Sequence, residues 1–85
     1  MEFRWNEWNL EHIGRHGVRP EEAEWVADRN PARDAGEDKY KVWGQSETGR
    51  YLQVVFVLDP DGRAFVIHAR ELTGREKRRF RRRRL

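Results

Sequence analysis

The sequence contains no cysteine, which excludes a disulfide framework and a thiolate zinc site. It also has no apolar run that approaches the ~18 residues of a membrane span. Its first residues, Met-Glu-Phe-Arg-Trp-Asn-Glu, are charged and aromatic, unlike the start of a secretory signal. From these absences we expect a cytoplasmic protein with no membrane partner.

The chain is also short, at 85 residues, and we expect a single domain over residues 1–85. A domain of this size buries only about 60% of its unfolded surface, which excludes a deep, enclosed cofactor cavity. The sequence has no glycine-rich phosphate loop, no paired-carboxylate pattern and no nucleophile elbow. We therefore expect no cofactor and no bound metal.

What the sequence does have is an uneven distribution of charge. Residues 70–85 hold nine Lys/Arg and two Glu, a local net charge of +7, so residues 1–69 carry −4 of the overall +3. A basic end of this kind attracts polyanions, nucleic acid first, although an arginine run is equally typical of a solvated helix end. Arginine outnumbers lysine 15 to 3, and the guanidinium fork suits phosphate, which favours nucleic acid slightly.

Hydrophobic periodicity predicts an α+β fold in the order β-α-α-β-β-β-α. The sheet would be an antiparallel meander of three or four strands. Two N-terminal helices pack on it, and a C-terminal helix opens at the Thr73–Glu76 capping box and runs into a basic tail at about 75–85. Tyr51–Leu58, the most apolar segment, is the expected central strand. The expected elements are a strand at 1–5, helices at 7–16 and 20–29, a loop at 32–38, and strands at 39–44, 51–58 and 63–70.

The strand at 63–70 carries the most informative polar residues. Strict alternation places Phe65, Ile67 and Ala69 on one face, and Ala64, Val66, His68 and Arg70 on the other. His68 and Arg70 then project side by side. An imidazole that moves protons beside a fixed cation suits phosphate chemistry. The alternative is a half-buried histidine, with Arg70 in an ion pair with Glu71 or Glu76.

A second histidine pair, His12 and His16, lies four residues apart on the first predicted helix. That spacing can hold a metal, but a metal site needs a third ligand, and no carboxylate lies at a spacing that would supply one. A packed, hydrogen-bonded pair is therefore the favoured interpretation. His16 is also a candidate for catalysis or phosphate binding. Arg50, at the turn after Thr48-Gly49, is either a second phosphate ligand or a solvated turn residue.

Four tryptophans are many for 85 residues. We expect Trp5 and Trp8 to lie in the core, where an aromatic side chain buries ~150–250 Å². Trp43 sits in a predicted strand, and either face is possible. Trp25 points away from the apolar stripe formed by Ala23, Val26 and Ala27. Its side chain therefore either is exposed and binds a partner or simply packs against the domain.

Three segments together resemble a known family. They are Trp5-Asn-Glu-Trp-Asn-Leu-Glu-His-Ile-Gly-Arg-His-Gly-Val18 with Pro20-Glu-Glu-Ala23, then Gly49-Arg50-Tyr-Leu-Gln-Val-Val55, and Ile67-His-Ala-Arg-Glu-Leu-Thr73 with Arg75-Glu-Lys-Arg-Arg79. In this order, over nearly the whole chain, they look like BrnT-like toxins. The resemblance implies a RelE-like fold and a ribonuclease toxin of a type II toxin–antitoxin pair. It also implies metal-independent RNA cleavage and, as partner, a small DNA-binding antitoxin of the ribbon-helix-helix type, with which an oligomer could form.

The family's recurring polar residues fall on His12, Arg15, His16, Arg50, Arg70 and Glu76. The sequence departs from the family pattern at Asn6, His68 and Phe80, where Asp, a small residue or Thr, and Tyr are usual. If the usual Tyr assists the reaction, Phe80 cannot replace it.

The mechanism that we predict is attack of the ribose 2′-OH on the adjacent phosphorus. His68 or His16 moves protons, and Arg70 and Arg50 stabilise the charged intermediate. The RNA backbone is expected to bind the remaining basic candidates, Arg15, Arg75, Lys77, Arg78, Arg79, Arg81 and Arg82, together with the neighbouring arginines up to Arg84. The alternative class is a non-catalytic module of the same fold that binds nucleic acid or a protein.

Overall fold

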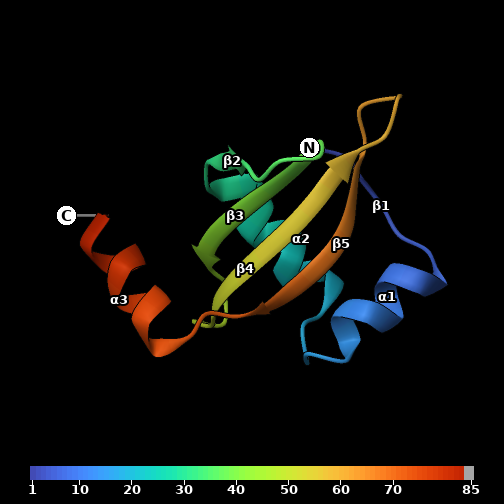
Figure 1. Ribbon diagram of the computed structural model, residues 1–85. Coiled ribbons are helices and arrows are strands. Elements are labelled where there is room, and N and C mark those ends of the chain that lie inside the picture. Colours follow the sequence, from blue (N-terminus) through green and yellow to red (C-terminus); the bar gives the residue numbers. More distant parts are fainter. Residues whose placement is uncertain (84–85) are drawn as a thin grey trace.

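The computed structural model describes residues 1–83 and shows an α+β domain, as the periodicity predicts (Figure 1). Arg84, which the basic tail was predicted to include, lies outside the described residues. No helix within residues 1–83 has the length and apolar character needed to cross a membrane. The elements are β1 (Phe3–Arg4), α1 (Glu7–Gly14), α2 (Pro20–Arg29), β2 (Ala32–Asp34), β3 (Lys39–Gln45), β4 (Tyr51–Leu58), β5 (Ala64–Glu71) and α3 (Gly74–Arg83).

The strands form one sheet in the order β1-β5-β4-β3-β2. β2 to β5 make the expected antiparallel meander, and β4 is its central strand, as predicted from its apolar composition. β1 adds a parallel edge, in which Phe3 pairs with Ala64 and Arg4 with Phe65. The sheet therefore has five strands, whereas the sequence predicts three or four.

The additional strand corrects the prediction of a loop at 32–38. Ala32–Asp34 pairs antiparallel with Val42, Lys41 and Tyr40 of β3. All three β2 residues are exposed. An edge strand of this kind is held by its backbone ladder and has no buried side chains, so it leaves no hydrophobic period in the sequence.

Local hydrogen bonds and one glycine define the helix ends. The side chain of Asn6 accepts from the backbone N–H of Asn9, and the Asn9 side chain accepts from the backbone N–H of Asn6, which closes a capping box at the start of α1. Gly17 ends this segment with a φ of +71°. The Thr73–Glu76 capping box at the start of α3 is also present.

A β-bulge in β5 corrects the predicted assignment of its faces. Val66 pairs with Phe56 but His68 pairs with Val55, so Ile67 is the extra residue. Beyond the bulge the alternation changes phase. Ala69 is fully buried on the same face as Ala64 and Val66, not on the face of Phe65. His68 and Arg70 therefore lie on the face opposite to Ala64 and Val66.

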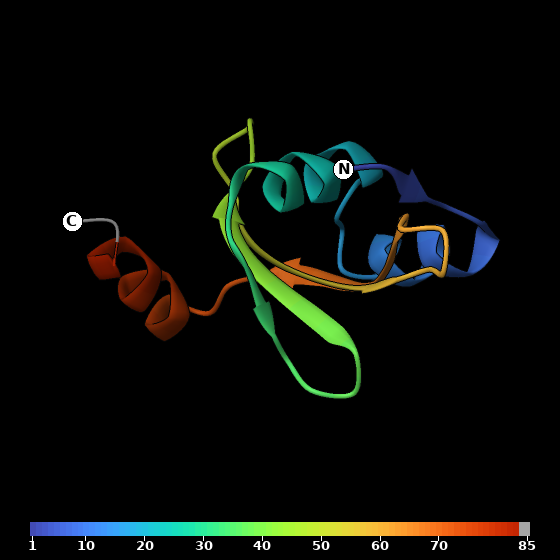
Figure 2. The same cartoon turned by 90° about the horizontal axis from the view of Figure 1, so that it is seen from above.

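The two faces of the sheet have different environments (Figure 2). α2 covers the first face, where its Ala23 and Val26 pack with Val42 and Val54 in the buried core. Gly44 lies on this face too, and a Cβ there would collide with the side chain of Asn30. Residues directly opposite one another on antiparallel strands share a face. The second face thus carries Arg33, Lys41, Trp43, Tyr51, Gln53, Val55, His68 and Arg70.

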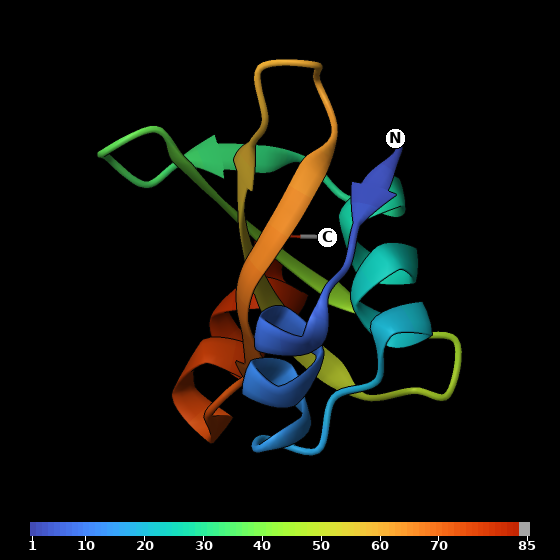
Figure 3. The same ribbon diagram turned by 90° about the vertical axis from the view of Figure 1, so that its right-hand side faces the viewer.

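α1 and α3 lie at different borders of the sheet. α1 runs along β5, beyond the short pairing with β1, and buries Ile13 in the core (Figure 3). α3 follows the end of β5 and buries Phe80, whose ring meets Tyr51 edge-on at 6.0 Å. The expectation of a core position for Trp8 is wrong, because its side chain remains 54% exposed. Trp5 packs against the core as expected and donates from its indole N–H to Glu24.

Candidate functional site

Three histidines meet where α1 borders β5. His12 and His16 project from α1 and its C-terminal turn, and His68 projects from β5. The His68 ring lies 5.0 Å from that of His16 and 6.0 Å from that of His12, both edge-on. Trp8 stacks on His12 at 4.9 Å and also on Phe65. The exposed tryptophan therefore forms one wall of this histidine cluster.

The environment of His68 favours its neutral form. Its half-buried position lowers its pKa below the ordinary 6.5, and the positive charges of His16, Arg70 and His12 lower it further. Within residues 1–83 no hydrogen bond holds any of the three imidazoles. The expected packed, hydrogen-bonded pair is therefore wrong: His12 stacks on Trp8, whereas His16 is exposed. His68 thus has a nitrogen that can accept a proton near neutral pH. No group of His, Cys, Asp or Glu within the same residues has an arrangement that would hold a metal ion.

Arg70 lies two residues beyond His68 on the second face, and its guanidinium is engaged. It donates to both carboxylate oxygens of Glu76 at 2.7 and 2.9 Å, and to the backbone carbonyl of Glu71 at 3.0 Å. The ion pair lowers the pKa of Glu76 to about 2 and raises that of Arg70. The arrangement is the ion pair with Glu76 that the sequence left as an alternative. It fastens the first turn of α3 to the end of β5.

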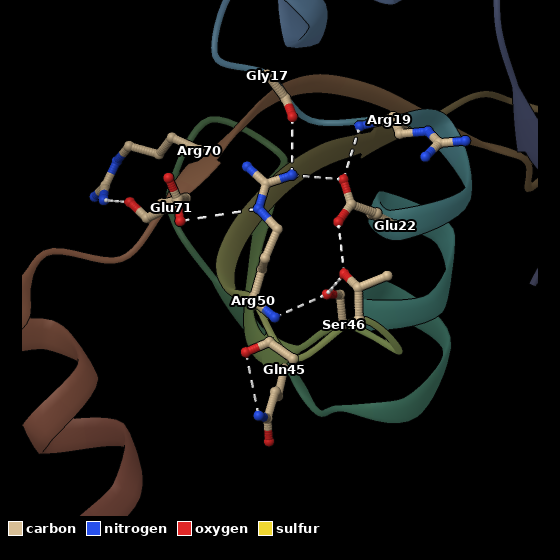
Figure 4. A network of polar contacts seen from close by, with 10 residues as sticks. Gly17, Arg19, Glu22, Gln45, Ser46, Arg50, Arg70 and Glu71 are labelled. Carbon is tan, nitrogen blue, oxygen red and sulfur yellow. Dashed lines mark hydrogen bonds and ion pairs between the residues drawn. The ribbon is translucent and has the colours of Figure 1, made fainter.

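Arg50 is also engaged, on the side of α2 (Figure 4). Its Nη1 donates to the carbonyl of Gly17 at 2.9 Å and to the carboxylate of Glu22 at 2.8 Å, and its Nε lies 3.8 Å from Glu71. Glu22 is nearly buried and also accepts from the hydroxyl of Thr48 and the backbone N–H of Arg19. Arg50 therefore ties the loop after His16 to α2 and to the β3–β4 turn.

The predicted RNA-binding residues occupy two places. Arg15 directly follows α1 as its C-cap and is exposed, in an ion pair with Glu11 at 2.8 Å. The others lie on α3, where Lys77 and Arg81 stand 5.3 and 6.0 Å from the ring of Tyr51, and Arg79 stands 5.9 Å from that of Trp43. The remaining α3 candidates are exposed: Arg75, Arg78 and Arg82.

A pocket of about 460 Å³ opens between α3 and the β2–β3 border, on the second face. Sequence reasoning missed most of it, although the alternation of Lys41 and Trp43 in β3 was a usable signal. Arg33 could not be assigned to a face of the sheet from the sequence, because the strand that contains it was not predicted. The lining residues are Asn30, Pro31, Arg33, Asp34, Lys41, Trp43, Arg79, Phe80 and Arg83.

The arrangement thus offers an imidazole of lowered pKa beside two others, two arginines already paired with carboxylates, and a basic helix beside an aromatic pocket. No protein-family model and no curated protein matches this chain.

Proposed function

We propose that this protein is a metal-independent endoribonuclease, the toxin of a type II toxin–antitoxin pair with a RelE-like fold, acting on RNA in the cytoplasm. The resemblance to BrnT-like toxins supports the toxin assignment and implies a ribbon-helix-helix antitoxin as partner. The observation that carries the catalytic part is the histidine cluster, in which His68 has two imidazoles within 5.0–6.0 Å and shares the second face with Arg70.

The cluster can supply both proton transfers of a cyclising cleavage. Neutral His68 takes the proton of the ribose 2′-OH, and the oxygen attacks the adjacent phosphorus. The bond to the 5′-oxygen breaks, and a protonated His16 or His12 donates a proton to that leaving oxygen. The products are a 2′,3′-cyclic phosphate and a 5′-hydroxyl. Burial and the neighbouring positive charges lower the pKa of His68, which favours the neutral form that a base needs for the first step.

The two arginines take different parts in this proposal. Arg70 stabilises the negative charge that develops on the phosphorane once a phosphate oxygen displaces the carboxylate of Glu76. Arg50 binds Gly17, directly after His16, and acts as a positioning residue for that end of α1. The basic side chains of α3 hold the RNA backbone.

A second candidate function is a non-catalytic module that binds nucleic acid or a partner protein. The engagement of Arg50 and Arg70 by carboxylates favours it, because both cations predicted to stabilise the phosphorane are neutralised.

Cleavage of end-labelled RNA in EDTA separates the two functions. We expect cyclic-phosphate ends, a loss of about 10²–10⁴-fold for His68→Ala, and a loss of about 10²–10³-fold for Arg70→Ala with partial rescue by Arg70→Lys. Arg63→Ala, which removes an exposed arginine from the β4–β5 turn, is the matched control. The acidic limb of the rate profile, with a midpoint below 6.5, should disappear with His68. An RNase activity that requires magnesium, or that His68→Ala leaves unchanged, would refute the mechanism.

A further inference from the structure

The pocket beside α3 combines unneutralised positive charge with an aromatic plane. Four of its lining residues are cationic, Arg33, Lys41, Arg79 and Arg83, against the single carboxylate of Asp34. None of the four has an ion-pair partner within residues 1–83. In this they differ from Arg50 and Arg70, which carboxylates already occupy.

These cations are crowded around one indole ring. Lys41, Arg79 and Arg83 stand 5.8, 5.9 and 6.0 Å from the centre of Trp43. The like charge of Arg33 lowers the pKa of Arg83 most, followed by burial and then by the like charge of Arg79. Positive charges gathered in this way repel one another, and an anion placed among them relieves the repulsion.

The plane of Trp43 is fixed in advance. Its indole N–H donates to the side-chain oxygen of Gln53 at 2.9 Å, across the pair of residues that β3 and β4 place opposite one another. A held ring loses little freedom when a ligand stacks on it. The pocket volume of about 460 Å³ falls within the ~300–1,000 Å³ of small-ligand sites.

We infer that this pocket binds an unpaired nucleotide of single-stranded RNA, with the base stacked on Trp43 and the flanking phosphates on Arg79 and Arg83. Aromatic platforms bordered by cations are the general means by which proteins hold single strands. The choice of RNA as ligand rests on the proposed function. The pocket and the histidine cluster share the second face, since Trp43, Gln53 and Arg70 lie in one row across three strands. The pocket thus holds a nucleotide close to the one that is cleaved.

The test uses two single-stranded probes that the proposed mechanism cannot cleave. One is a 2′-O-methyl oligoribonucleotide, which lacks the attacking hydroxyl. The other is an abasic phosphodiester of equal length, which keeps the charge and lacks the bases. Trp43→Leu should weaken binding of the first probe about 5- to 150-fold, the range for loss of one stacked base. It should change binding of the abasic probe less than about twofold.

Two further variants separate stacking from damage to the fold. Trp43→Phe loses the same hydrogen bond to Gln53 but keeps an aromatic plane, and should retain most of the affinity. Trp25→Leu is the matched control, because Trp25 belongs to α2 on the other face and already lies under Arg29, 3.4 Å from its ring centre. Arg79→Gln should weaken both probes alike and lower the salt slope by ~0.7, whereas Arg82→Gln, outside the pocket, should do so less.

Equal losses for Trp43→Leu and Trp43→Phe would overturn the inference, and so would a Trp43→Leu variant that loses as much affinity for the abasic probe as for the 2′-O-methyl probe. So would polyglutamate that competes as well as the oligonucleotide, which would assign the pocket to an acidic peptide. Because neither probe is cleaved, these results do not depend on catalysis. If the cleavage assay fails but binding of the 2′-O-methyl probe still depends on Trp43, the proposed mechanism is refuted and the inference about the pocket stands.

Discussion

The Arg70–Glu76 ion pair should give the protein a stability that depends on pH in the acidic range. Glu76→Gln removes the charge but keeps the helix cap, because a glutamine oxygen can still accept from the backbone N–H of Thr73. The variant therefore tests the ion pair and not the start of α3. The structure gives two short hydrogen bonds, 2.7 and 2.9 Å, between side chains that remain 29% and 21% exposed.

The expected magnitude follows from the pKa of Glu76. A decrease from 4.5 to about 2 corresponds to roughly 3 kcal/mol, which solvent screening of the partly exposed pair reduces to about 1 kcal/mol. Because folding lowers this pKa, the contribution is complete above pH 4.5 and is lost as the pH falls towards 2. In a domain of this size a change of 1 kcal/mol moves the melting temperature by ~4–8 °C.

Urea unfolding of wild type and Glu76→Gln, followed by tryptophan fluorescence between pH 7 and pH 2, measures this contribution. The difference in the free energy of unfolding should be constant down to about pH 5 and then shrink to near zero. Glu11→Gln is the control, since its pair with Arg15 has an equally short distance of 2.8 Å but side chains 65% and 69% exposed. A difference that persists at pH 2, or that is absent at pH 7, would show that the pair does not fasten α3.

Three further predictions concern packing and polar contacts in the body of the domain. Gly44→Ala should lower the free energy of unfolding by ~1–3 kcal/mol in thermal or urea unfolding, because the new Cβ meets Asn30; an unchanged midpoint would show that Asn30 moves aside freely. Asn9→Ala should cost ~1–3 kcal/mol in the same assay, because it removes two hydrogen bonds of a fully buried side chain, and a neutral result would contradict this. Arg50→Gln should cost ~3 kcal/mol, because it leaves the carboxylate of Glu22 without its partner. Adding Glu22→Gln should recover part of this loss, and a double-mutant cycle without coupling would exclude the pair as a stabilising contact.

The features that the sequence predicts well are those set by a few neighbouring residues. The capping box from Thr73 to Glu76 needs only local chemistry, and it is present. The cap at Asn6 and the turn at Asp59–Gly62 are equally local in origin. The central position of Tyr51–Leu58 follows from its composition alone, because only a strand with neighbours on both sides buries so many apolar residues.

The features that the sequence missed depend on tertiary pairing. The bulge at Ile67 inserts a residue whose effect on the faces of β5 appears only in the register with β4. Trp8 was assigned to the core by its size, but it packs on His12 and Phe65 at the surface. The pairing of Arg70 with Glu76 was foreseen only as an alternative, because the sequence does not show how closely α3 returns to the strand before it.

The pairing of β1 with β5 has a consequence for how the chain folds. Phe3 meets Ala64 and Arg4 meets Phe65, and the Arg4 side chain binds Asp59, so these contacts close a loop of about sixty residues. Closing a long loop costs entropy before any contact repays it. The β2–β5 meander, in contrast, forms through short turns. During synthesis β1 must therefore wait until β5 has been made, so β1 precedes β5 in the chain but is among the last elements to find its place.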